Sequence, residues 1–272
     1  MNTPPAIRRA FADLSIGQVH YASCGDCNAP AVLLLHQTPR SWAEYREVLP
    51  LVGQTHRAIA MDTPGFGDSA PLPGPASIEA WAAVAVELLD ALAISRAHVV
   101  GHHTGAVIAL ALAAACPARV ASLVLSSLSY TGEVFRRARR EQPPIDAIEP
   151  CADGGHLAAL WQRRQSFYPP GRPELLEAFV CDALKVSGEL EAGHRAVAAY
   201  RMEDAIGRVG QPTLLIRAGK DPFASPHVPE LLAHLPQASV VDIEAGMVPL
   251  PDQLPRAFAS AVLDFLSAQA SR

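Results

Sequence analysis

A histidine lies between two glycines at the point where an apolar strand turns into an apolar helix. The turn reads Gly101-His102-His103-Thr104-Gly105. A tight strand-to-helix turn pushes one side chain, here that of His103, up from the sheet toward a pocket, and the glycines let strand and helix pack closely. Because imidazole titrates near neutral pH, His103 can accept or donate a proton or attack an acyl group. We expect proton transfer, without a serine-like covalent step.

Two reaction classes follow from a proton-transferring His103. As a general base it would deprotonate water, which leads to hydrolysis, or an acidic C–H or O–H of the substrate, which leads to lyase-type cleavage. As a nucleophile it would form an acyl intermediate, but no second histidine is evident to assist deacylation. The sequence leaves hydrolysis and lyase chemistry open.

The elements around this turn alternate between strand and helix patterns from residue 32 onward, which predicts a parallel sheet covered by helices. The apolar run 31–35 is typical of a strand buried on both faces. An antiparallel hairpin is expected before it, at residues 8–14 and 18–24. Further strands are predicted at residues 57–61, 98–100, 120–125, 213–217 and 239–243. Helices are predicted at residues 42–49, 78–92, 105–115, 228–235 and 254–266.

One long segment, from about residue 130 to 210, breaks this alternation. It shows no convincing strand but three or four amphipathic helical patterns punctuated by Pro and Gly, which predicts a helical insertion between the sixth and seventh strands. One pattern carries large side chains at i, i+3, i+6 and i+7, which are Trp161, Arg164, Phe167 and Tyr168. This stripe either packs against the rest of the protein or roofs a substrate pocket. We treat its four residues as substrate-binding candidates, and His194 as a weaker one.

Composition excludes several classes of function. The chain has 22 basic and 27 acidic residues and a net charge of −5, so nothing favours nucleic acid as a partner. The most apolar segment, residues 106–115, is too short to span a bilayer, and the N-terminus lacks the apolar stretch of a signal peptide. Five cysteines without a secretory context favour a reducing cytoplasm. We therefore expect a cytoplasmic protein without membrane association.

Four segments, in order along the chain, resemble signature motifs of the α/β-hydrolase fold superfamily. They are Leu33-Leu34-Leu35-His36-Gln37-Thr38-Pro39, Met61-Asp62-Thr63-Pro64-Gly65-Phe66-Gly67-Asp68-Ser69, the Gly101–Gly105 turn and Gly219-Lys220-Asp221-Pro222. The resemblance extends over essentially the whole chain, and within the superfamily it is to the capped group of epoxide hydrolases, haloalkane dehalogenases and C–C hydrolases. It implies a mostly parallel eight-stranded sheet flanked by helices. The core domain would comprise residues 1–130 and 211–272, and a helical cap residues 131–210.

The resemblance also implies a catalytic triad that is altered at two of its three positions. His103 stands where the family has its nucleophile, and Met247 where it has the catalytic histidine. Only the acid, Asp221, remains, and we expect it to orient or charge His103. Met247 would occupy the volume of the missing histidine, either as a neutral filler or as part of the pocket wall.

The motif at residues 36–39 is similar to the H-G-x-P loop that helps to form the family's oxyanion hole, with Gln37 in place of the glycine. The backbone amide of Thr104, together with that of Gln37 or Thr38, would face a developing oxyanion. His36 matches a histidine that mainly holds this loop, and we include it as a catalytic candidate beside that structural role.

The leading expectation is an enzyme that acts on a small, partly apolar substrate through His103, without a cofactor. His36, His103 and Asp221 come from converging loops, but no metal-binding spacing supports a metal site there. The alternative is a catalytically silent ligand-binding protein on the same fold, because a fold alone does not establish activity. A homodimer is left open.

Overall fold

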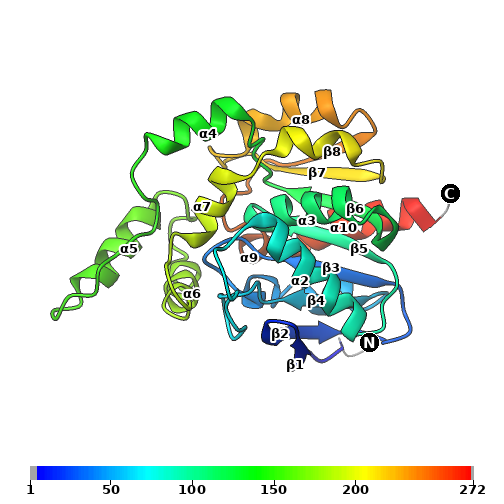
Figure 1. Cartoon of the computed structure of the whole chain (residues 1–272), viewed down its shortest axis with the longest axis horizontal. Coiled ribbons are helices and arrows are strands. Elements are labelled where there is room, and N and C mark those ends of the chain that lie inside the picture. The colour runs from blue at the N-terminus through cyan, green and yellow to red at the C-terminus, as the bar shows by residue number, and fades with distance from the viewer. Residues whose placement is uncertain (1–4, 271–272) are drawn as a thin grey trace.

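An eight-stranded sheet forms the centre of the molecule, with helices on both faces (Figure 1). The computed structural model describes residues 5–270. The strand order is β1-β2-β4-β3-β5-β6-β7-β8; the first two strands run antiparallel to their neighbours and the remaining pairs are parallel. The bounds are β1 (Arg8–Leu14), β2 (Gly17–Cys24), β3 (Ala31–Leu35), β4 (Arg57–Met61), β5 (Ala97–His102), β6 (Val120–Ser126), β7 (Thr213–Ala218) and β8 (Ala238–Ile243). The predicted fold class is confirmed.

Alternation along the central strands divides the core into two layers. In β3, Leu33 and Leu35 belong to the apolar cluster on one face, whereas Val32 and Leu34 belong to the cluster on the other. Successive side chains of a strand point to opposite faces, so a continuous apolar run is buried twice. The first layer is covered by α2 (Ile78–Ala91), α3 (Thr104–Ala115) and α8 (Val228–His234), and the second by α1 (Leu49–Val52), α9 (Leu250–Gln253) and α10 (Pro255–Ala270).

The helix predicted at residues 42–49 is divided in the structure. A short 3-10 turn, Trp42–Tyr45, is followed by a separate start at α1. Pro50 lies in the first turn of α1 and has no N–H to donate to a preceding turn, so a continuous helix is interrupted there. The prediction of one helix was wrong for this reason.

The insertion between β6 and β7 contains helices only, as predicted, within the described residues. They are α4 (Glu133–Arg140), α5 (Gly155–Gln165), α6 (Pro173–Ala183), α7 (Ala192–Ala199) and two 3-10 turns, Met202–Asp204 and Ile206–Arg208. Figure 1 shows α5 and α6 extending away from the sheet, and α4 and α7 nearer to the strands. The exact division between core and cap remains a prediction.

None of the helices in residues 5–270 is long and apolar enough to cross a membrane. The most apolar of them, α3, has every residue except Ala115 buried. Its apolar character is therefore explained by its position between the sheet and α2.

Candidate active site

The turn between β5 and α3 holds His103 in an unusual backbone conformation, with φ 47° and ψ −112°. Positive φ is strained for a residue with a side chain and persists only where the surroundings enforce it. Two close contacts do so: a Cβ on Gly101 would lie 2.2 Å from the carbonyl oxygen of Gly105, and a Cβ on Gly105 would lie 1.9 Å from that of Leu35. The turn therefore requires both glycines and directs the His103 side chain away from the sheet.

His103 meets the predicted acid. Its Nε2 lies 2.9 Å from Oδ2 of Asp221, whose side chain is fully buried at the end of β7. The ring N–H is not aligned with that oxygen well enough for a hydrogen bond, so the contact is electrostatic, and it becomes an ion pair when His103 takes up a proton. Burial acts to raise the pKa of Asp221, but the attraction of His103 and the Phe223 amide, 2.9 Å from Oδ1, hold it below its usual range. Asp221 is therefore ionised at neutral pH.

The oxyanion candidates are only partly suited to that role. The amide of Gln37 donates to Oε2 of Glu44 at 2.9 Å, and the Gln37 side chain donates to Oε1 at 2.5 Å. The prediction that the Gln37 amide faces an oxyanion was wrong, because this buried carboxylate takes its hydrogen. Thr104 remains suitable as the first residue of α3, where amides have no intrahelical partner. Thr38 lies beside it, with the two Oγ1 atoms 2.9 Å apart.

His36 has no free ring nitrogen for catalysis. Its Nε2 accepts from the amide of Thr63 at 3.0 Å, so Nδ1 carries the proton and donates to the carbonyl of Gln37 at 2.7 Å. The ring is completely buried, and this burial lowers its pKa. His36 thus joins the ends of β3 and β4. The expectation that it is catalytic was wrong, whereas its structural role agrees with these contacts.

His102, the neighbour of His103, positions the loop that follows β8. Its Nε2 donates to the carbonyl of Val248 at 2.8 Å, and Nδ1 accepts from the hydroxyl of Ser126 at 2.9 Å. Burial and the nearby charge of His103 lower the pKa of His102 to about 3, so the ring is neutral. Val248 lines the cavity described next, whereas Met247 does not. Of the two roles expected for Met247, the one in the pocket wall was wrong, and the neighbouring Val248 has that position instead.

A cavity of about 830 Å³ opens above His103, between the sheet and the insertion. This volume suits a small organic molecule. Its apolar lining includes Val107, Phe135, Phe167, Val197, Phe223 and Val248. Its basic lining consists of His103, Arg139, Arg163, Arg164 and His194. No acidic side chain of the described residues lines it directly.

The predicted stripe on α5 is divided between two environments. Phe167 and Arg164 line the cavity, and the Phe167 ring lies 4.8 Å from that of Phe223. Trp161 and Tyr168 do not line it. They pack in the separate apolar cluster between α5 and α6, where Tyr168 contacts Phe179 edge-on at 5.9 Å. Their assignment as substrate-binding residues was wrong because α6 covers that side of α5.

Arg164 forms a buried ion pair with a carboxylate that no sequence pattern predicts. Its Nε donates to Oδ1 of Asp146 at 2.7 Å, and its Nη2 donates to Oδ2. His194 approaches the same Oδ2 with Nε2 at 2.8 Å. Burial acts to raise the pKa of Asp146, but the hydrogen bond from His194 and the charge of Arg164 lower it to about 2. No motif or spacing marks Asp146, and it was missed for that reason.

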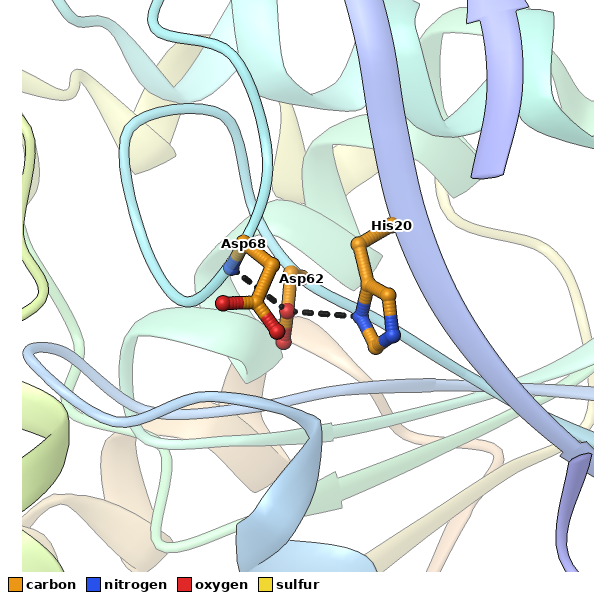
Figure 2. A group of neighbouring side chains, drawn as sticks. All are labelled: His20, Asp62 and Asp68. Atoms are coloured by element: carbon orange, nitrogen blue, oxygen red, sulfur yellow. Dashed lines mark hydrogen bonds and ion pairs between the residues drawn. The ribbon is translucent and has the colours of Figure 1, made fainter. Parts of the chain in front are cut away.

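Within residues 5–270, two groups of side chains have the composition of a metal site. In the first, His20 and Asp68 lie on either side of Asp62 (Figure 2). His20 Nδ1 donates to Asp62 at 2.8 Å, since its Nε2 accepts from Arg9, and Asp62 also accepts from the amide of Asp68 at 3.0 Å. These hydrogen bonds explain why the three side chains lie together, since they stabilise the turn after β4.

The second group consists of Asp146, Glu191 and His194. Its two carboxylates also have hydrogen-bond partners already. Arg164 takes both carboxylate oxygens of Asp146, and Oε1 of Glu191 accepts from the amides of Asp146 and Ala147. A cation at this place would displace the guanidinium of Arg164. The group is explained as an ion-pair network.

Known proteins resemble this chain in sequence and in structure. The sequence model of the alpha/beta hydrolase fold family matches residues 30–150. Epoxide hydrolase 2 of Siraitia grosvenorii is 41% identical over 115 residues, which are 41% of this chain and 36% of that protein. The 2-hydroxymuconate semialdehyde hydrolase of Pseudomonas sp. (strain CF600) is 36% identical over 151 residues, 55% of this chain and 46% of that protein. The chain thus spans less than half the length of these two curated relatives.

The structural likeness extends further along the chain. A hydrolase from Pseudomonas aeruginosa PA01 superimposes with a TM-score of 0.77 at 25% identity and covers 95% of this chain and 98% of its own. An enol-lactonase from Burkholderia xenovorans LB400 has a TM-score of 0.78 at 22% identity, over 95% of this chain and 100% of that one. The chain therefore has the alpha/beta hydrolase fold, and its residues 30–150 carry the sequence features of that family.

Proposed function

We propose that this protein is an enzyme that hydrolyses a small, partly apolar substrate, with His103 as the general base. The observation that carries the proposal is the pairing of His103 with the buried, ionised Asp221 at the floor of an 830 Å³ cavity. A strained turn is maintained to present this side chain. Strain of this kind is concentrated at functional sites.

In this proposal the two ring nitrogens of His103 have separate tasks. Because Asp221 is ionised and lies beside Nε2, the proton of the neutral ring belongs on Nε2, and Nδ1 keeps its lone pair. Nδ1 can then take a proton from a water molecule as the water oxygen attacks the substrate. Asp221 stabilises the imidazolium that forms. In this arrangement His103 is the base and the water molecule is the nucleophile.

The charge that develops on the substrate oxygen requires hydrogen-bond donors. The amide of Thr104 at the start of α3 is one, supported by the positive end of the helix dipole. The amide of Thr38 is the second in this proposal, since the Thr38 side chain is held against Thr104. Such a donor is typically worth about 10²–10³ in kcat.

The known relatives support hydrolysis over lyase-type cleavage, because both curated relatives described above are hydrolases by name. The aromatic walls supplied by Phe135, Phe167 and Phe223 favour a substrate with an apolar portion. Abstraction of a proton from substrate carbon or oxygen by the same Nδ1 would convert this site to lyase chemistry.

The proposal is tested by turnover of a panel of activated esters, lactones and epoxides. We expect His103→Ala to lower kcat/KM by about 10²–10⁴ relative to wild type, which is the usual contribution of a general base. His56→Ala is the matched control, because His56 precedes β4 at the opposite end of the parallel strands. It should retain wild-type turnover.

Two outcomes contradict the proposal. Equal turnover by wild type and His103→Ala would remove His103 from the chemistry. A wild-type protein that turns over no member of the panel would favour the alternative of a silent ligand-binding protein.

A further inference from the structure

A second histidine–carboxylate pair faces the same cavity from the insertion. His194 lies in α7 and lines the cavity together with His103. Its Nε2 is 2.8 Å from Oδ2 of Asp146, and its side chain is 16% exposed, as is that of His103. Each of the two histidines thus has a buried carboxylate behind it and the cavity in front, and His194 Nε2 lies in addition 3.3 Å from Nη2 of Arg164.

The pair is held rigidly from behind. Asp146 is fully buried and accepts two hydrogen bonds from Arg164, and its amide donates to Glu191. With its pKa lowered to about 2, Asp146 is a carboxylate throughout the neutral range, although burial alone would raise that pKa. Because an ionised carboxylate can only accept a hydrogen bond, the His194 nitrogen that faces Asp146, Nε2, carries a proton. Within residues 5–270, both hydrogen-bond contacts of the His194 ring, with Asp146 and with Arg164, are made by Nε2, which leaves Nδ1 for a substrate.

A close contact places α7 beside the catalytic turn. Gly193 packs so tightly on Thr38 that a Cβ on this glycine would lie 2.3 Å from the Thr38 methyl group. Thr38 in turn contacts Thr104, the residue after His103. His194, which follows Gly193, is therefore positioned at the edge of the same reaction centre.

We propose that His194 is a second catalytic residue, a general acid that protonates the oxygen that leaves the substrate; this inference rests on the proposed function. In the step, His103 Nδ1 takes a proton from water, and the water oxygen forms a bond to the electrophilic carbon. The bond from that carbon to the leaving oxygen breaks. The leaving oxygen keeps the electron pair and receives the Nδ1 proton of the His194 imidazolium, whose charge Asp146 stabilises.

The dependence of the rate on the leaving group tests this role. Phenyl acetate expels a basic phenoxide that needs a proton, whereas p-nitrophenyl acetate expels a stable anion that does not. We expect His194→Gln to lower kcat/KM for phenyl acetate by about 10²-fold, within the usual range for a general acid, and to change that for p-nitrophenyl acetate far less. A purely structural role of His194 would not alter the ratio of the two.

The control is His156→Gln, a histidine of the same insertion that does not line the cavity. Thermal unfolding checks that each variant is folded, and His194→Asn is a second substitution at the same position. An unchanged ratio, or an equal loss on both esters, overturns the role of His194 while a dependence on His103 leaves the proposed function intact. If wild type hydrolyses neither ester but turns over another member of the panel, the role of His194 in releasing an ester oxygen is overturned and the proposed function stands.

Discussion

At the scale of single residues, the site depends on a side chain held in a conformation that its own chemistry disfavours. His103 has φ 47° and ψ −112°, a region that glycine adopts freely and other residues rarely. The imidazole is long enough to reach Asp221 from this turn, with 2.9 Å between Nε2 and Oδ2. Position and reach together allow one residue to serve as the base.

The strain at His103 predicts a difference between two truncations. His103→Gly and His103→Ala both remove the imidazole, but only alanine keeps the Cβ that conflicts with positive φ. We expect the glycine variant to have a free energy of unfolding higher by about 1 kcal/mol or more, since such conformations cost of order 1–3 kcal/mol. Urea unfolding of both variants measures it. Equal stabilities would mean that the turn relaxes once the imidazole is gone.

At the scale of elements, a buried arginine connects the insertion to the core. Arg40, fully buried in the loop after β3, donates through Nε to Asp182 of α6 at 2.8 Å and through Nη1 to Asp252 of α9 at 2.5 Å. The hydroxyl of Ser41 donates to the other oxygen of Asp182 at 2.8 Å. The position of α6, and with it the packing of α5, therefore depends on charges that are removed from water.

Breaking this connection is expected to be costly. Asp182→Asn leaves the buried Arg40 with one carboxylate fewer and should lower the free energy of unfolding by about 3 kcal/mol, the lower end for a broken buried pair. The control is Asp242→Asn, which disrupts an exposed pair with Arg217 on the neighbouring strand and should cost less than about 1 kcal/mol. Chemical denaturation compares the two. Similar small losses would show that α6 is held by apolar packing instead.

At the scale of the whole molecule, Glu44, which accepts the hydrogen bond of the Gln37 amide, also links the stability of the protein to pH. Burial raises the pKa of Glu44 to about 7, although Arg40 acts to lower it. In the unfolded chain a glutamate titrates near 4.5. Because the folded pKa is the higher one, the stabilising contribution is complete below pH 4.5 and is lost as pH rises through about 7.

The replacement Glu44→Gln should remove this part of the pH dependence. Wild type is expected to lose stability relative to the variant as the pH rises from about 4.5 to about 7, by about 1.4 kcal/mol for each pH unit. Free energies of unfolding from urea titrations at several pH values measure the difference. If the two proteins keep a constant difference across this range, Glu44 is ionised in the folded state at all of these pH values.

Local sequence patterns were sufficient for much of the fold. The runs at β3 and β4 have the predicted bounds, because burial on both faces requires an unbroken apolar segment. The glycines around His103 identified the turn, since nothing larger fits at either position. The single long helix predicted at residues 42–49 was wrong, because Pro50 requires a new helix start.

By itself, the sequence determined the α/β architecture, the helical insertion and the presence of an imidazole at the strand-to-helix turn. These follow from periodicity and from glycines that act over a few residues. The tertiary structure alone decided that Glu44 takes the Gln37 amide, that Trp161 and Tyr168 face α6, and that Asp146 stands behind His194. Each of these contacts depends on how separate elements pack, and a side chain's partner across elements is set by that packing and not by its neighbours in the chain.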